Sequence, residues 1–391
     1  MRTAFLASTV YTPDPIPGGV LLVEDGRIAA VGTREQVSIP KGAQVVQLGE
    51  ASIAPGFIDI HVHGAGGRDL MEPVREAADT VSRALARHGT TSYYATTVTA
   101  PAADTLQTLE FLAGYIAERE GANVPAAQPL GIHMEGPYIS VKRRGVHPVE
   151  SIAEPTLEGY RRMAKAANGT LRIMTIAPEL AAAPELIAEM VRSGVRPSIG
   201  HTDATCEQAE RAVELGARQA THTFNAMRPF AHRDPGVIGA VLTDPRIKAE
   251  LIADGVHVDP TAIRVLYQAK GASGIILVSD GVSGTGMPDG LYPVAGFLVE
   301  VKGGVCRYQD ALAGSVLTLD RAVRNMRQFL GLSLAQALPM ATLNPAELLG
   351  IADRKGALKP GADADLVVLD TEGTVQGTYV RGVAVTANGR K

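Results

Sequence analysis

The chain has 391 residues, 37 basic and 41 acidic side chains with a net charge of −4, and 46% hydrophobic residues. The charges are interspersed, which excludes the basic surface of a nucleic-acid-binding protein, and no apolar run reaches the roughly 18 residues of a membrane span. This length suits one large domain plus a smaller one. Cys206 and Cys306 are too few for a disulfide framework, and the N-terminus lacks the pattern of a secretory signal, so we expect a cytoplasmic protein.

Both ends of the chain read as short β-strands separated by turns. The pair Asp25-Gly26 between two apolar runs is typical of a β-hairpin. The expected strands cover residues 20–23, 27–32, 365–370, 375–380 and 382–385. Because each end alone would make a marginal domain, we expect them to pair into one small β-sandwich domain of residues 1–54 plus 346–391, leaving residues 55–345 for the catalytic domain.

Between the two ends, amphipathic helical stretches alternate with short apolar runs. The expected helices cover residues 76–87, 105–119, 184–193 and 207–215, and the expected strands cover residues 91–96, 130–132, 173–177, 196–199, 249–253 and 274–278. This alternation predicts an α/β protein whose parallel sheet closes into a (β/α)8 TIM-like barrel. A doubly wound open sheet is the alternative, but no G-x-G-x-x-G motif follows a strand.

Most of the nine histidines, together with two carboxylates, follow directly after an apolar run instead of lying on a helix face. In a barrel enzyme the active site lies at the carboxyl ends of the strands. Side chains at these positions should therefore converge on one pocket. The candidate ring consists of His61, His63, Glu135, His201, His222, His257 and Asp280.

His61 and His63 close the first expected barrel strand. Residues two apart on a strand point to the same side, so both imidazoles can face one ion; two solvated histidines are the alternative. Glu135 closes another strand, where a buried carboxylate needs a cation or donors. A salt bridge would satisfy Glu135 equally, but no basic residue precedes it locally. His133 shares its face deeper in the strand, and we expect it to be structural or to support the ligands.

His201 and His222 each close a further strand. Imidazoles combined with a carboxylate suit Zn²⁺ or Fe²⁺ and leave a position for water. Asp280 ends the last clear barrel strand, where a hydrolase needs a group that accepts a proton from water and returns it to the leaving nitrogen. A helix N-cap is the alternative role for Asp280. The pattern predicts a metal-dependent amidohydrolase.

Longer segments carry a family resemblance over nearly the whole chain. PGFIDIHVHG, HMEGPYIS followed by KRRGVH, GHTDA, THTFNAM, ADGVHVD, VSDG, LAGS and GALKPGADADLVVLD occur in this order. Together they resemble the amidohydrolase superfamily and, within it, the family of N-acetylglucosamine-6-phosphate deacetylases. HMEGPYIS with THTFNAM is specific to that family, whereas HxH and PGADADLVV mark only the superfamily. Dihydroorotases and hydantoinases are disfavoured, because they bridge two metals with a carboxylated lysine and no lysine lies in the strand of Glu135.

The resemblance implies roles for individual residues. The principal metal site would be Glu135, His201 and His222, Asp280 would be the catalytic acid and base, and His147 would polarise the acetyl carbonyl. Some members have Gln-x-Asn in place of His61 and His63 and bind one metal, so this chain would bind one or two divalent ions per subunit. Zn²⁺ is the first expectation, with Fe²⁺, Mn²⁺ and Co²⁺ as alternatives.

The resemblance also implies a substrate, a partner and a reaction. Arg233 would bind the substrate phosphate across the subunit interface of a homodimer. The reaction would convert N-acetylglucosamine 6-phosphate to glucosamine 6-phosphate and acetate, in amino-sugar catabolism and cell-wall recycling. A deacetylase or deaminase with another substrate is the alternative, and a non-catalytic scaffold is disfavoured because the ligand set is complete. The substrate-binding positions would be Val146, Asn225, Ala226, Arg233, His257, Leu312, Ala313 and Gly314.

Overall fold

The computed structural model describes residues 2–12 and 14–385. Its centre is a parallel eight-stranded sheet in the order β17-β16-β15-β14-β13-β12-β11-β8. Val62 pairs in parallel with Gly281 beyond β17, and the N–H of Asp280 donates to the carbonyl of His61 at 2.9 Å, which closes the predicted barrel. The strands are β8 (Phe57–Val62), β11 (Thr90–Thr97), β12 (Gln128–Glu135), β13 (Leu171–Ile176), β14 (Arg196–Ile199), β15 (Gln219–Ala220), β16 (Lys248–Leu251) and β17 (Ile275–Leu277).

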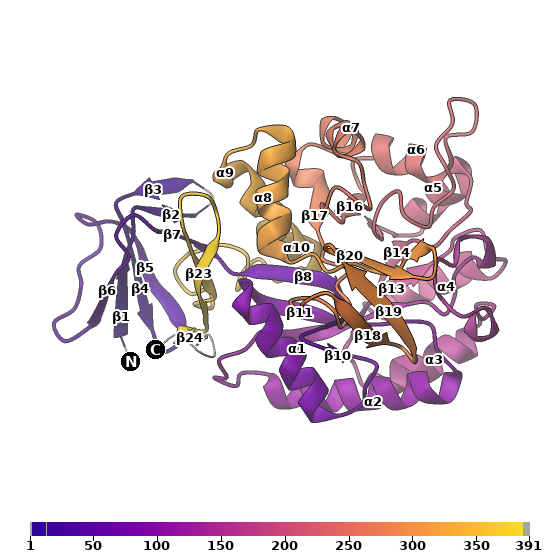
Figure 1. Cartoon of the computed structure of the whole chain (residues 1–391), viewed down its shortest axis with the longest axis horizontal. Coiled ribbons are helices and arrows are strands. Elements are labelled where there is room, and N and C mark those ends of the chain that lie inside the picture. Colours follow the sequence, from indigo (N-terminus) through magenta and orange to yellow (C-terminus); the bar gives the residue numbers. More distant parts are fainter. Residues whose placement is uncertain (1, 13, 386–391) are drawn as a thin grey trace.

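Helices alternate with the barrel strands and cover the outside of the sheet (Figure 1). The expected helices and barrel strands are confirmed to within about three residues at their ends. In α5 the Thr205 hydroxyl accepts the N–H of Gln208 at 3.3 Å, a capping box that starts the helix. No helix in the described part of the chain is long and apolar enough to cross a membrane. The helices are α1 (Arg75–Arg87), α2 (Ala102–Arg119), α3 (Leu157–Ala166), α4 (Ala183–Arg192), α5 (Cys206–Glu214), α6 (Gly236–Thr243), α7 (Pro260–Lys270), α8 (Leu319–Leu330), α9 (Leu334–Ala337) and α10 (Leu343–Leu349), with short 3-10 turns η1 (Val141–Arg143), η2 (Val149–Ser151), η3 (Ala272–Gly274) and η4 (Leu338–Ala341).

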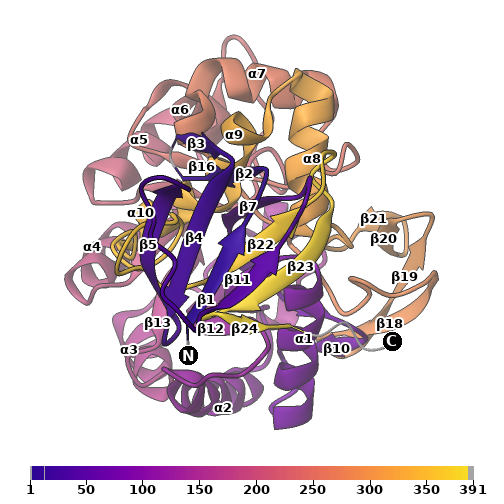
Figure 2. The ribbon, with the colours of Figure 1, turned by 90° about the vertical axis from the view of Figure 1, so that its left-hand side faces the viewer.

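Strands from the two ends of the chain lie together beside the barrel (Figures 1 and 2). One sheet has the order β5-β4-β1-β6, and the other has the order β24-β23-β22-β7-β2-β3. Phe5 and Leu21 of the first sheet share a buried apolar cluster with Ile53 and Leu366 of the second, so the sheets pack as the expected sandwich. The strands are β1 (Arg2–Leu6), β4 (Gly19–Glu24), β5 (Arg27–Thr33) and β6 (Gln44–Gln47), then β2 (Thr9–Tyr11), β3 (Pro15–Pro17), β7 (Ser52–Pro55), β22 (Leu366–Leu369), β23 (Val375–Val380) and β24 (Val383–Ala384).

The division between the two domains remains a proposal. Antiparallel pairing of β7 with β22 joins the N-terminal end of the chain to the C-terminal end. The proposed boundary at residue 346 falls inside α10, whereas the boundary at residue 54 falls inside β7. We keep residues 1–54 plus 346–391 as the proposed small domain and residues 55–345 as the proposed catalytic domain.

A four-stranded antiparallel sheet after β17 was not expected from the sequence. Its order is β18-β19-β20-β21, and both figures place it apart from the sandwich. Along β19, exposed Leu298 and Glu300 alternate with buried Val299 and Val301, the period of a strand with one packed face. The carboxylate of Asp69 accepts the N–H of Ala295 at 2.9 Å and holds the hairpin tip against the barrel. The strands are β18 (Gly290–Val294), β19 (Phe297–Lys302), β20 (Val305–Tyr308) and β21 (Ala311–Leu312), and the short pair β9 (Gly64–Ala65) and β10 (Arg68–Asp69) lies nearby.

Candidate active site

The candidate residues reach the centre of the barrel from the ends of several strands. Glu135 is the last residue of β12 and His61 lies near the end of β8, whereas His201, His222 and Asp280 follow β14, β15 and β17. Those last residues have φ of +47°, +28° and +47°, which non-glycine residues rarely adopt. Each sharp turn aims a side chain back over the barrel. Such strain costs about 1–3 kcal/mol per residue and is found mainly at functional sites.

The carboxylate of Glu135 lies in the middle of a group of imidazoles. Its Oε1 is 3.1 Å from His201 Nε2, 3.0 Å from His222 Nε2 and 3.3 Å from His61 Nε2. Its other oxygen, Oε2, is 3.3 Å from His63 Nε2. Glu135 is 4% exposed, so these imidazoles are its main polar neighbours. One carboxylate therefore connects both sets of predicted metal ligands.

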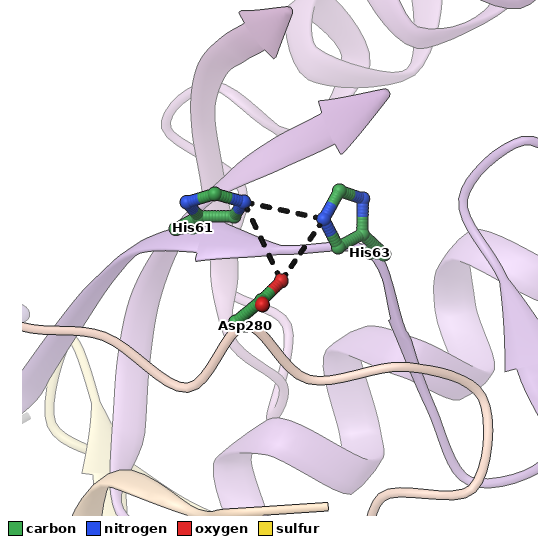
Figure 3. Close-up of side chains that lie close together, drawn as sticks. All are labelled: His61, His63 and Asp280. Atoms are coloured by element: carbon green, nitrogen blue, oxygen red, sulfur yellow. Dashed lines mark hydrogen bonds and ion pairs between the residues drawn. The ribbon is translucent and has the colours of Figure 1, made fainter. Parts of the chain in front are cut away.

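His61, His63 and Asp280 form a triangle of side chains whose polar atoms face one another (Figure 3). The two Nε2 atoms are 3.2 Å apart. Asp280 Oδ1 lies 3.2 Å from the Nε2 of His63 and 3.5 Å from that of His61. The predicted acid and base therefore touches the histidine pair directly, in agreement with its expected position at the end of the last barrel strand.

The hydrogen bonds of the imidazoles fix which nitrogen carries a proton. His201 Nδ1 lies 2.9 Å from the carbonyl of Arg143, which only accepts, so Nδ1 is the donor and Nε2 presents a lone pair. That lone pair faces the Oε1 of Glu135 and, at 3.1 Å, the Nε2 of His222. A divalent cation between these atoms would bind both the lone pair of His201 and the oxygen of Glu135. The donor set, imidazole nitrogens with carboxylate oxygens, fits a divalent metal ion.

His147 has the opposite tautomer. Its Nδ1 accepts the backbone N–H of Thr99 at 3.2 Å, so the proton is on Nε2. Nε2 points at Glu135 Oε2, 3.3 Å away, and the ring packs edge to face on that of His201. Although its position beside Glu135 and His201 would also suit a ligand, a protonated nitrogen cannot bind a metal. His147 instead offers a hydrogen-bond donor to Glu135 or to a molecule bound in the cavity that both residues line.

The electrostatics of the cluster favour positive charge between ionised carboxylates. Burial opposes ionisation of Glu135, but the charge of His61 and the hydrogen bond from His147 hold its pKa well below the ordinary value. Asp280 is likewise buried, yet His61 and His63 lower its pKa to about 2. Burial would lower the pKa of His63, but Asp280 and Glu135 raise it to about 9. Burial lowers the pKa of His201 to about 4, so that ring is neutral.

A cavity of about 200 Å³ opens beside the cluster. Its apolar wall includes Val98, Val282, Val294 and Phe297, of which Val294 and Phe297 come from the tip of the unexpected hairpin. These apolar residues are absent from the sequence-based site. The predicted residues that line the cavity are His63, Glu135, Val146, His147, His201, His222, Asn225, Ala226, His257, Asp280, Leu312, Ala313 and Gly314.

Two predicted residues lie outside this lining. His61 is fully buried beneath it. Arg233 is exposed on the loop between β15 and α6, and the structure of one chain does not bring it to the cavity. His257, at the rim, is held by the carboxylate of Asp254, whose Oδ2 accepts from Nδ1 at 2.7 Å. His133 donates to the carbonyl of Ile60 and accepts from a threonine hydroxyl, as a structural histidine should.

Sequence reasoning missed two buried carboxylates behind the candidate ligands. Glu250 in β16 and Asp59 in β8 are both about fully buried. Asp59 Oδ1 accepts the N–H of His61 at 3.2 Å and that of Ser279 at 3.3 Å. The available signal was an acidic residue inside an otherwise apolar strand, since a charge in that position needs partners.

Residues 52–385 match the amidohydrolase family. The chain belongs to this family. N-acetylglucosamine-6-phosphate deacetylase from Bacillus subtilis (strain 168) is 38% identical over 94% of this chain and 92% of the relative. N-acetylgalactosamine-6-phosphate deacetylase from Escherichia coli O157:H7 is also 38% identical, over 93% of each chain.

Solved structures of amidohydrolase enzymes share the whole fold. A mutant N-acetyl-D-glucosamine-6-phosphate deacetylase from Mycobacterium smegmatis, solved in complex with N-acetyl-D-glucosamine-6-phosphate, superposes with a TM-score of 0.92 at 35% identity. The superposition covers 99% of this chain and 100% of the Mycobacterium smegmatis chain. The N-acetylglucosamine-6-phosphate deacetylase from Pasteurella multocida gives a TM-score of 0.92 at 31% identity, with 99% and 100% covered. These matches confirm the barrel and the small β-structure beside it.

Proposed function

We propose that the chain hydrolyses the acetamide of N-acetylglucosamine 6-phosphate to glucosamine 6-phosphate and acetate, in amino-sugar catabolism and cell-wall recycling in the cytoplasm. The observation that carries the proposal is the buried Glu135 carboxylate, surrounded by imidazoles and with Asp280 within reach of the same cluster. The similarity to deacetylases of sugar phosphates over almost the whole chain supports the choice of substrate.

The cluster would hold one or two divalent ions, of which Zn²⁺ suits the nitrogen and oxygen donors best. Glu135, His201 and His222 would hold the first ion. His61 and His63 would hold a second ion that shares Glu135, because both Nε2 atoms face that carboxylate at 3.3 Å. A divalent ion here supplies Lewis acidity, which lowers the pKa of water from about 15.7 toward 7.

The residues of the chain would then perform the proton transfers. Asp280 is ionised at neutral pH, so its carboxylate accepts a proton from the water that attacks the acetyl carbon. The N–H of His147 Nε2 stabilises the oxyanion that develops on the acetyl oxygen. As the C–N bond breaks, Asp280 returns the proton to the leaving nitrogen. The oxygen of the water therefore ends in acetate, and one of its protons ends on the free amine of the sugar.

Substrate positioning would involve a second subunit. Arg233 is exposed, and none of the described residues of its own chain forms an ion pair with it. Its loop is fixed by Arg228, whose Nε donates to Asp234 at 2.9 Å. In a homodimer, Arg233 would bind the phosphate of substrate held by the neighbouring subunit. Asn225, Ala226 and His257 would contact the sugar, since they line the same cavity as the cluster. Val146, Leu312, Ala313 and Gly314 would surround the acetyl group.

A second candidate substrate is N-acetylgalactosamine 6-phosphate. It is favoured by the Escherichia coli relative named for that substrate, which is as similar to this chain, at 38% identity, as the Bacillus subtilis relative named for N-acetylglucosamine 6-phosphate. The two sugars differ only in the orientation of one hydroxyl. The same residues would catalyse both reactions.

The experiment is to measure acetate release from both phosphorylated sugars and from unphosphorylated N-acetylglucosamine, with metal-replete protein and its Arg233→Met variant. We expect the highest kcat/KM for N-acetylglucosamine 6-phosphate. Arg233→Met should raise KM for the phosphorylated sugar far more than it lowers kcat, because the residue binds and does not react. Equal turnover of the unphosphorylated sugar, or an unchanged KM in the variant, would contradict the assignment of the substrate.

A further inference from the structure

Glu250 is a buried carboxylate that the mechanism above does not use. It lies in β16 and points into the barrel, where its exposure is 0%. Taking an ion out of water costs several kcal/mol unless donors surround it. A charge retained at such a position therefore implies specific partners.

Its partners are parts of the metal-binding cluster. Glu250 Oε2 lies 3.0 Å from Nδ1 of His61 and accepts the backbone N–H of His222 at 3.1 Å. Oε1 accepts from the side-chain amide of Gln219. One carboxylate thus holds the side chain of one candidate ligand and the backbone of another, at the position where His222 has its positive φ.

The contact to His61 determines the tautomer of that ring. An ionised carboxylate only accepts hydrogen bonds, so the neutral ring carries its proton on Nδ1. Its Nε2 then presents a lone pair to a space bounded by His63 Nε2 at 3.2 Å and Asp280 Oδ1 at 3.5 Å. With the proton on Nε2, the same ring would donate to Asp280 or Glu135 and occupy that space itself.

His61 differs from the other ligands in this respect. The Nδ1 of His201 donates to a backbone carbonyl. The Nδ1 atoms of His63 and His222 have no hydrogen-bond partner among residues 2–12 and 14–385. A charged acceptor behind an imidazole increases the basicity of its other nitrogen, and losing such a partner typically weakens metal affinity about 10–100-fold.

We propose that Glu250 is the positioning residue for the second metal ion: as a charged acceptor it holds His61 in its metal-binding tautomer and increases the basicity of Nε2, and it thereby determines how tightly an ion binds at His61 and His63. The inference rests on the proposed function, in that it assumes a divalent metal at this cluster. It goes beyond that function by naming the residue that determines how tightly the second ion binds.

The test is a Zn²⁺ titration of the metal-free protein, with bound metal measured by equilibrium dialysis and elemental analysis. Glu250→Gln keeps the shape and an acceptor oxygen but removes the charge. The new side-chain N–H₂ at position 250 can donate to the Oε1 of Gln219 if the side-chain amide of Gln219 rotates by half a turn. That oxygen has no partner among the described residues. His61→Asn identifies the binding step that depends on the imidazole. Glu179→Gln is the matched control, because this carboxylate accepts from the hydroxyl of Thr202 and the N–H of Asp203, next to His201, but contacts no imidazole among the described residues.

We expect the unsubstituted protein and Glu179→Gln to bind two ions per chain, and His61→Asn to lose one of them. Glu250→Gln should weaken that same step about 10–100-fold and leave the other step unchanged. The inference is overturned if Glu250→Gln binds Zn²⁺ as the unsubstituted protein does, if it weakens both steps equally, or if the unsubstituted protein binds one ion at saturation.

A second measurement needs no substitution at Glu250. Nitrogen NMR of the zinc-loaded protein, with the His61 signals assigned by their loss in His61→Asn, should show a proton on Nδ1. An unprotonated Nδ1 would contradict the inference even if Glu250→Gln failed to fold. Acetate release is recorded separately. If Glu250→Gln loses the second ion but the unsubstituted protein releases no acetate, only the proposed substrate is contradicted. If the unsubstituted protein releases acetate but Glu250→Gln binds both ions normally, only the inference about Glu250 is contradicted.

Discussion

Replacing His147 by leucine should abolish most of the activity without removing metal. The ring has only one N–H to offer, because Nδ1 already accepts from the backbone of Thr99 at 3.2 Å. The substitution therefore removes a single donor to the developing oxyanion. Loss of one such donor typically costs about 3–4 kcal/mol, which is a decrease in kcat of about 100- to 1,000-fold. KM should change little, since the hydrogen bond strengthens mainly in the transition state.

The assay is steady-state acetate release together with metal content for each purified variant. His147→Gln is the matched control, because its amide can place an N–H near the position of Nε2 and should retain much of the activity. Unchanged metal content in His147→Leu separates a donor from a ligand, the two roles that its position beside Glu135 and His201 permits. Loss of a metal ion from His147→Leu, or equal loss of activity in both variants, would refute the tautomer argument.

Further predictions concern regions outside the cluster. Lys355 is 4% exposed, and its Nζ lies 3.2 Å from Asp363 Oδ2. Lys355→Met would leave a buried carboxylate without this cation, so it should lower the free energy of unfolding, measured by urea denaturation, by about 3–5 kcal/mol. An unchanged urea concentration at the unfolding midpoint would contradict this. Burial opposes ionisation of Asp363, but Lys355 holds its pKa below the ordinary 3.8, so its stabilising contribution is present above that pH and is lost as the pH falls below it. The stability difference between the unsubstituted protein and Asp363→Asn should therefore shrink as the pH falls below about 4, and a constant difference would argue against it. Burial raises the pKa of Cys306 to about 12, so thiol reagents at pH 7 should label Cys306 slowly until urea unfolds the protein; rapid labelling of the folded protein would show that the hairpin sheet opens.

The positions of the candidate ligands could be predicted from the sequence, because a barrel brings together the residues that follow its strands. Periodicity located the strands, and His201, His222 and Asp280 follow three of them directly. The sharp turns with positive φ that aim these side chains inward leave no comparable signal, since histidine and aspartate are unusual there. They are visible only in the backbone.

Other features depend on contacts between distant segments. Glu250 lies 189 positions from the ring it holds, so the sequence shows an acidic residue in a strand but not its partner. The role of His147 likewise depends on the N–H of Thr99, 48 positions away. The β18–β21 sheet was missed because the expected alternation of helices and strands stopped at residue 278, although the alternating burial of β19 has the period of a strand. Arg233 is exposed on the surface, and the proposed contact of its side chain lies in a second subunit, so neither the sequence nor the structure of one chain contains that contact.

The most direct test of the proposed reaction is to incubate the metal-replete protein with N-acetylglucosamine 6-phosphate and to quantify both acetate and free amine. We predict equal amounts of the two products, loss of the reaction after chelation and recovery on addition of Zn²⁺. Asp280→Asn should retain less than about 1% of the rate, because a general acid and base typically contributes about 100- to 10,000-fold. Equal turnover by the metal-free protein, or no products from the metal-replete protein, would contradict metal-dependent deacetylation at this cluster.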